Sequence, residues 1–160
     1  DLFVANYGAN NFLYENRGGG ELVRVTEGAA VTDGGSSTSA AWGDFDGDGD
    51  LDLFVANYWD ENNFLYENRG GGELVRVTEG AAVTDGGSST SAAWGDFDGD
   101  GDLDLFVANL NQNNFLYENR DGGELVRVTE GAAVTDGGYS TSAAWGDFDG
   151  DGDLDLFVAN

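Results

Sequence analysis

The segment Asp44-Phe45-Asp46-Gly47-Asp48-Gly49-Asp50-Leu51-Asp52 carries a carboxylate at every second position. The same nine residues recur at 96–104 and 147–155. Five bare carboxylates at this spacing repel one another, and a hard divalent cation with oxygen ligands removes the repulsion. The two glycines permit the backbone angles of a tightly turned loop. The segment therefore predicts a cation-binding loop, present three times.

Calcium is the expected metal, at about one ion per complete aspartate loop, because it accepts about six to eight oxygen ligands in flexible geometry. Spacing by two aims Asp44, Asp46 and Asp48 inward, and the Asp50 carbonyl and the Asp52 carboxylate would complete the shell. Magnesium requires a smaller octahedral site, and zinc requires His or Cys, which the chain lacks. The candidate metal ligands are Asp44, Asp46, Asp48, Asp50, Asp52, Asp96, Asp98, Asp100, Asp102, Asp104, Asp147, Asp149, Asp151, Asp153 and Asp155.

Other loop types fit the segment less well. Position twelve is Val55, where an EF-hand needs a bidentate Glu, and strands rather than helices are expected on both sides. A nonapeptide calcium β-roll has a much shorter period than this chain. A solvated acidic hairpin turn is the remaining alternative, but it gives no reason for glycines at matching positions in three loops.

The hexapeptide Asp-Leu-Phe-Val-Ala-Asn sets the period of the chain, because it begins at Asp1, Asp52, Asp104 and Asp155. Spacings of 51, 52 and 51 residues are typical of propellers, solenoids and linear arrays. One unit contains four expected strands, at 37–43, 52–57, 63–68 and 73–79, and residues 79–88 link it to the next unit. No stretch shows ten or more residues of helical periodicity. The sequence thus predicts an all-β protein built from four-stranded antiparallel blades.

Three repeats of this unit fill the chain. The predicted division is a partial repeat with strands two to four (1–36), two complete repeats (37–88 and 89–139), and a partial repeat with strands one and two (140–160). The apolar segment at 64–66 and its counterparts at 12–14 and 115–117 are expected in the core. Trp42, Trp94 and Trp145 lie beside the aspartate loops, where packing between sheets is expected and a ligand platform is the alternative.

The segment from Ala41 to Asn57, followed by Asn63 to Asn68, resembles the FG-GAP or VCBS repeat, which forms blades of the integrin α-chain propeller and of many secreted bacterial propellers. The resemblance covers essentially the whole chain. The family signature Asp-x-Asp-x-Asp-Gly-x-x-Asp falls on the loops beginning at Asp44, Asp96 and Asp147. The family's Phe-Gly and Gly-Ala-Pro landmarks are degenerate here, since the chain has no Pro. The resemblance implies propeller blades whose loops between the first and second strands bind calcium.

Three repeats do not close a normal propeller, which has about four to eight blades. The partial repeats leave strand edges unpaired, and such edges favour pairing with another chain. Two copies could complete a six-bladed ring, or pairing that does not close would give a filament. Alternatively, the 160 residues are a window on a longer repetitive polypeptide.

Composition excludes several functions. A formal net charge of −25 argues against nucleic acid as a partner and disfavours anionic membranes, and no apolar run is long enough to be inserted in a membrane. Without His, Cys or Lys, general acid–base and nucleophilic chemistry has few candidate groups, so no enzymatic activity is expected.

The copies differ most between strands two and three. The candidates for partner binding are Trp59 and Tyr58 there, and Tyr139 where the other copies have Ser, since exposed aromatic residues are enriched in interfaces. The expected function is that of a secreted, calcium-binding structural protein that self-associates through its open blade edges. The alternatives are a binding or adhesion module that recognises glycan or protein through its loops, and an engineered symmetric propeller.

Overall fold

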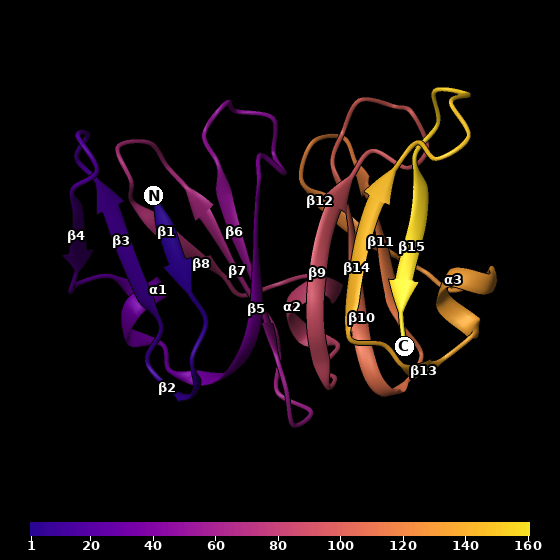
Figure 1. Ribbon diagram of the computed structural model, residues 1–160, viewed down its shortest axis with the longest axis horizontal. Coiled ribbons are helices and arrows are strands. Elements are labelled where there is room, and N and C mark those ends of the chain that lie inside the picture. The colour runs from indigo at the N-terminus through magenta and orange to yellow at the C-terminus, as the bar shows by residue number, and fades with distance from the viewer.

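The chain forms an array of antiparallel sheets in the computed structural model, which describes residues 1–160 (Figure 1). The first sheet contains β1 (Leu2–Val4), β3 (Phe12–Asn16) and β4 (Leu22–Val25). The second contains β5 (Gly35–Gly43), β6 (Asp52–Asn57), β7 (Phe64–Asn68) and β8 (Leu74–Val77), with β2 (Tyr7–Ala9) beside β5. The third contains β9 (Ser89–Gly95), β10 (Asp104–Gln112), β11 (Phe115–Arg120) and β12 (Glu124–Val128), with β13 (Gly138–Tyr139) beside β10. The fourth is the pair β14 (Ser142–Gly146) and β15 (Asp155–Ala159).

The second strand is the most buried element of each four-stranded blade. In β6 the side chains of Leu53, Phe54 and Val55 are fully buried. Phe54 lies opposite Ala41 of β5 and Leu65 of β7. A strand enclosed on both faces needs a continuous apolar run instead of alternation, which is the pattern of the repeated hexapeptide. The predicted all-β fold of four-stranded blades is confirmed.

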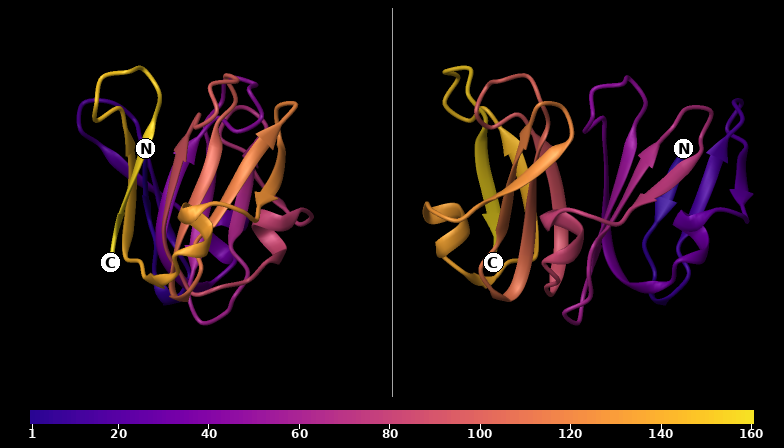
Figure 2. Two further views of the ribbon diagram at one scale, coloured as in Figure 1. Left: turned by 90° about the vertical axis from the view of Figure 1, so that its right-hand side faces the viewer. Right: turned by 180° about the vertical axis from the view of Figure 1, so that it is seen from behind.

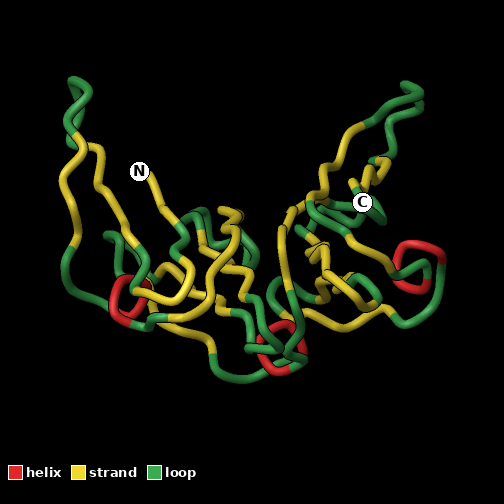
Figure 3. The backbone as a smooth tube through the Cα atoms, turned by 60° about the horizontal axis from the view of Figure 1, so that its bottom comes forward, coloured by secondary structure: helices red, strands yellow, loops and turns green.

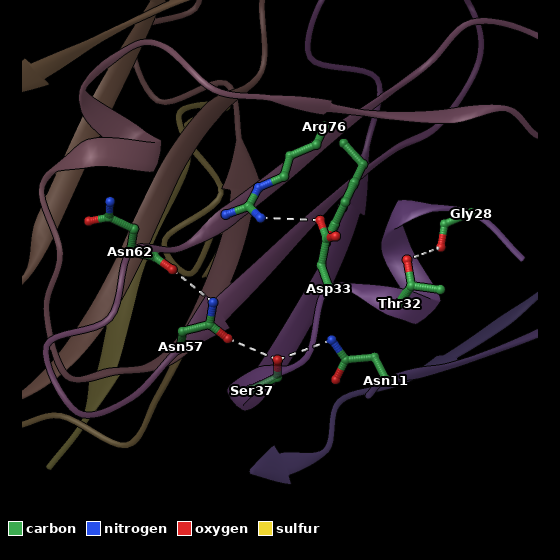
Figure 4. Close-up of polar contacts among 9 residues, drawn as sticks. Asn11, Gly28, Thr32, Asp33, Ser37, Asn57, Asn62 and Arg76 are labelled. Carbon is green, nitrogen blue, oxygen red and sulfur yellow. Dashed lines mark hydrogen bonds and ion pairs between the residues drawn. The ribbon is translucent and has the colours of Figure 1, made fainter. Parts of the chain in front are cut away.

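The expected strands agree with the observed ones to within two residues at each end. Asn63 lies outside β7 because its side-chain Oδ1 accepts the Asn57 backbone N–H at 2.8 Å and closes the β6–β7 loop. A related buried network joins the residue before β3 to β5 and to the last residue of β6 (Figure 4). There the Ser37 hydroxyl donates to Asn57 Oδ1 at 2.8 Å and accepts from Asn11 Nδ2 at 3.1 Å.

The linkers between blades contain short helices that the sequence pattern did not predict: α1 (Ala29–Thr32), α2 (Ala81–Thr84) and α3 (Ala132–Thr135). Four residues are too few to display helical periodicity. Each helix follows a glycine with φ near 102°, and the Thr84 hydroxyl donates back to the Gly80 carbonyl at 2.9 Å. α2 lies at the junction of the two central sheets, against β7 and β12 (Figure 2). No helix in the chain has the length and apolar character needed to cross a membrane.

The sheets stack side by side as blades, with the first strands innermost. β5 lies against β9, and β9 lies against β14. The Thr38 hydroxyl donates to the Ser89 carbonyl at 2.7 Å, and Thr90 repeats this contact with Ser140 at the same distance. The tube view shows an open arc whose two termini lie on opposite arms (Figure 3). The architecture is therefore that of a partial propeller.

Candidate metal centre

Each aspartate loop joins the first strand of a blade to the second, and all three loops emerge at the same end of the array (Figure 1). The first loop starts and ends at a paired position, since Gly43 lies opposite Asp52 in the β5–β6 ladder. Gly47 and Gly49 have φ angles of 74° and 95°, which residues with a Cβ atom adopt only at a cost. The chain can therefore turn tightly enough to bring alternate aspartates to one side.

Three carboxylates gather in each loop, with oxygens within 4.8 Å of one another. The three sets are Asp44, Asp46 and Asp48; Asp96, Asp98 and Asp104; and Asp147, Asp149 and Asp155. The structure thus brings together nine of the fifteen aspartates that the sequence singled out. The composition of the set differs between loops, because the ninth residue takes the place of the fifth in the second and third loops.

Asp44 has a buried carboxylate oxygen, Oδ1, without a hydrogen-bond partner. Its other oxygen, Oδ2, accepts the Gly49 backbone N–H at 3.0 Å. Burying a charged oxygen without a partner is costly, and coordination to a cation removes that cost. The oxygen donors of the set are the ligands that calcium prefers. The residues present therefore fit a hard divalent cation.

Asp46 shows the electrostatic strain of the same set. Burial is the largest cause that raises its pKa, and the charges of Asp48, Glu67 and Asp44 raise it further. The Asp48 backbone N–H, which donates to Asp46 Oδ1 at 3.1 Å, acts in the opposite direction. A bound cation would relieve the repulsion that these carboxylates exert on one another.

Asp52 anchors the first loop to the rest of its blade. Its Oδ2 accepts the Phe45 N–H at 2.9 Å, and its Oδ1 accepts the Asn68 N–H from β7 at 2.8 Å. Burial raises the pKa of Asp52 to about 6, although these two hydrogen bonds act to lower it. Asp104 has the same two kinds of partner, Phe97 and Asn119, and a pKa also raised by burial to about 6. No sequence pattern had indicated the backbone donors on the third strand.

Six of the singled-out aspartates lie outside the three sets: Asp50, Asp52, Asp100, Asp102, Asp151 and Asp153. The backbone N–H of the seventh residue of each loop donates to the carboxylate of the fifth residue; in the first loop the Asp50 N–H donates to Asp48 Oδ1 at 2.8 Å. The Asp102 carboxylate accepts the Gly122 N–H at 3.1 Å, from the β11–β12 turn. This contact ties the loop to the neighbouring hairpin.

The candidate partner-binding residues lie away from the aspartate loops. Trp59 and Tyr139 are each 65% exposed. Tyr58 packs against Trp59 with ring centroids 5.0 Å apart and against Tyr7 at 6.4 Å. The Trp59 indole N–H donates to the Tyr7 hydroxyl. Tyr7 was not singled out from the sequence, although it follows the same hexapeptide as Tyr58 and so occupies the same position of its repeat.

Comparison with known proteins gives two findings. The model of the FG-GAP-like repeat family matches three times, at residues 1–55, 44–107 and 96–158. Relatives include cartilage acidic protein 1 of Homo sapiens and of Mus musculus, each 30% identical over 176 residues, and that of Xenopus tropicalis, 29% identical over 177 residues. Each alignment covers 100% of this chain and 26% of the relative. The chain thus spans about a quarter of the length of these relatives.

Proposed function

The chain belongs to the FG-GAP-like repeat family, and on that premise we propose that it is an extracellular, calcium-binding structural module that self-associates through its open blade edges. The observation that carries the calcium proposal is the triple set of clustered carboxylates, with the unpartnered buried Oδ1 of Asp44 in the first of them. In this proposal the aspartate oxygens of each loop hold one cation.

The proposed ion fixes the connection between the first and second strands of a blade. In the first loop Asp44, Asp46 and Asp48 would hold it, while Asp52 keeps the loop attached to β7. Three ions carry six positive charges and would change the formal net charge from −25 to −19. Because the ion binds the folded chain and a preformed loop does not exist in the unfolded one, binding stabilises the fold.

An extracellular setting suits both the chemistry and the relatives. Calcium is abundant outside cells, where weak sites of about 10⁻⁴–10⁻³ M affinity still fill. The relatives are named for cartilage and for acidity, and this chain is itself strongly acidic. The proposal includes no enzymatic activity, because the chain has no His, Cys or Lys to act as a base or nucleophile.

Self-association is supported by the strand edges at the two ends of the arc. β1 pairs only with β3, and β15 pairs only with β14, so each second strand exposes one edge. In both complete blades the second strand is paired on both sides. Exposed edges with a defined register are templates for another strand of the same kind.

Calcium titration tests the proposal. Isothermal calorimetry of the chelator-stripped chain should report three bound ions, and Asp44→Ala should remove one of them. The matched control is Glu130→Ala, which removes an exposed acid outside the loops and should leave three. At a calcium concentration one hundred times the dissociation constant, each site should add about 2.7 kcal/mol of stability, or roughly 5–10 °C in Tm. Three ions bound equally well by Asp44→Ala would contradict the assignment.

A binding or adhesion role is a second candidate, favoured by the exposed aromatic cluster of Tyr7, Tyr58 and Trp59. Such clusters suit a sugar ring or an aromatic side chain of a protein. Screening the chain against a glycan array, with Trp59→Ala as the comparison, tests this role. Binding that disappears in Trp59→Ala would support it, and an empty array would leave the structural role.

A further inference from the structure

Neighbouring blades meet at a joint that occurs twice in the chain. Trp94 stacks on Phe45 with ring centroids 6.3 Å apart, and its indole N–H donates to the Ala41 carbonyl at 3.3 Å. A Cβ atom on Gly43 would lie only 2.6 Å from the Trp94 ring, so the ring fits only against glycine. Trp145 makes the same contacts one repeat later: it stacks on Phe97, donates to the Ala93 carbonyl at 3.2 Å and covers Gly95. These two equivalent sets of contacts define the joint between neighbouring blades.

The ends of the arc expose the two halves of this joint. At the C-terminal end Phe148 is 84% exposed and Phe157 is 70% exposed, where their counterparts Phe45 and Phe54 are buried. A Cβ atom on Gly146 would meet nothing within 4 Å. This end therefore presents the glycine and phenylalanine surface without a tryptophan on it.

At the N-terminal end, Trp42 borders a pocket of about 210 Å³ that is also lined by Asn68, Gly72 and Leu74. One repeat later, the corresponding residues surround Phe45: Trp94, Asn119, Gly123 and Leu125. The Asn119 side chain there donates to the Phe45 carbonyl at 2.6 Å. The pocket beside Trp42 is thus shaped for the phenylalanine of an aspartate loop, and Trp42 has no acceptor for its indole N–H.

A second contact is divided in the same way. The Asp33 carboxylate forms an ion pair with Arg76 at 3.2 Å, which Figure 4 shows, and accepts a hydrogen bond from the Tyr66 hydroxyl at 3.3 Å. Asp85 repeats the arrangement with its own Arg and Tyr partners. At the ends of the arc, Arg24 stacks on a phenylalanine ring but pairs with no carboxylate, and the exposed Asp136 pairs with no cation.

Because the two ends of the arc carry matching halves of the same contacts, we infer that a second copy of this chain docks head to tail and completes a shared blade. This inference rests on the proposed self-association. Phe148 of one copy enters the pocket beside Trp42 of the other, and Trp42 covers Gly146. Asp136 of the first copy pairs with Arg24 and Tyr14 of the second. The halves of one copy lie on opposite arms of the arc, so they do not meet within it (Figure 3). Two copies would hold four complete and two shared blades, which is within the range of closed propellers.

The shared blade has one strand too many, because β1 and β15 are copies of the same second strand. β15 keeps five residue pairs with β14, and its Asp155 accepts the Phe148 N–H at 2.9 Å. β1 keeps only three pairs with β3 and is three residues long. The strand with fewer residue pairs is the easier one to displace. β1 therefore leaves the shared blade, and β15 of the first copy pairs with β3 of the second.

Sedimentation velocity in millimolar calcium tests the docking, with Gly146→Ala as the main variant. The added methyl has free space in a single copy, so the stability of the chelated monomer should not change. It would meet the Trp42 ring of a docked copy, so the dissociation constant should rise at least about tenfold. Thr84→Ala changes an exposed residue of α2, between the two complete blades, and serves as the control with unchanged association. Deleting residues 1–4 should leave association intact.

A charge exchange tests the second contact. Arg24→Asp and Asp136→Arg should each weaken association, while an equimolar mixture of the two restores it, because every junction in the mixed pair joins opposite charges. Arg17→Asp changes the charge equally at a residue that pairs only with Glu15, and it should have no effect.

The outcomes separate this inference from the proposed function. If the chain associates but Gly146→Ala and the charge variants associate equally well, the shared blade is wrong and self-association stands. If the chain binds calcium and stays monomeric, the shared blade and the proposed self-association are both wrong, and only the calcium proposal stands.

Discussion

The first and third aspartate loops have identical sequences and different surroundings. Phe45 is 7% exposed, and Phe148 is 84% exposed. Asp52 accepts a backbone N–H from its own loop and one from β7, whereas Asp155 accepts only the first kind. The first loop owes its anchoring to a third strand and to the tryptophan of the next blade. The loop sequence therefore specifies the turn, while the neighbouring strands supply the contacts that hold the loop in place.

Removal of Trp94 should have the largest effect on the free energy of unfolding. Trp94→Ala empties the completed joint between Phe45 and Gly43, and we expect a loss of about 3–5 kcal/mol in the free energy of unfolding. Trp42→Ala should cost clearly less, because Trp42 occupies a half-formed joint. Urea unfolding of both variants in chelator, where association does not contribute, measures the difference. Equal losses would show that the joint between blades adds no stability.

The pH dependence of the calcium-free chain probes the anchoring aspartates. The folded-state pKa values of Asp52 and Asp104 are raised by burial from 3.8 to about 6. Their contribution to stability is therefore fully present below pH 3.8 and is lost as the pH rises through 6. The expected loss is about 2–3 kcal/mol for each carboxyl group.

Thermal unfolding in chelator from pH 4 to pH 7 checks this expectation. The Tm should fall over that range, and calcium at pH 7 should restore it because the ion favours the ionised carboxylates. Asp155→Asn alters only the third loop and should keep the fall. A Tm that stays constant or increases from pH 4 to pH 7 in chelator would contradict the assignment.

The smallest effect on the free energy of unfolding is expected at the ion pair between Arg76 and Asp33. Arg76 lies over the Phe64 ring at 4.0 Å and pairs with Asp33, whereas Arg24 has only the ring contact with Phe12. Arg76→Met should therefore cost about 0.5–1 kcal/mol more than Arg24→Met in the monomer, since the pair is partly exposed. Urea unfolding of the two variants in chelator measures this difference, and a larger loss in Arg24→Met would contradict it.

The sequence was sufficient for the repeat, the blade and the loops. The hexapeptide fixed the period, and its continuous apolar run identified a strand buried on both faces. Glycines at matched positions marked the turns of the aspartate loops. The four-residue linker helices gave no periodic signal and were missed. Tyr7 was missed because its partner Trp59 is 52 residues away along the chain.

Local chemistry explains what the sequence alone determined: strand periodicity, turn residues and the alternation of carboxylates are all properties of neighbouring residues. The tertiary structure decided which aspartates share a site: Asp104 joins the carboxylate set of its loop and Asp52 does not, although both accept a backbone N–H from the third strand. It also decided that identical residues are buried in one blade and exposed in another. Burial depends on the blade that packs alongside, and no residue carries that information by itself.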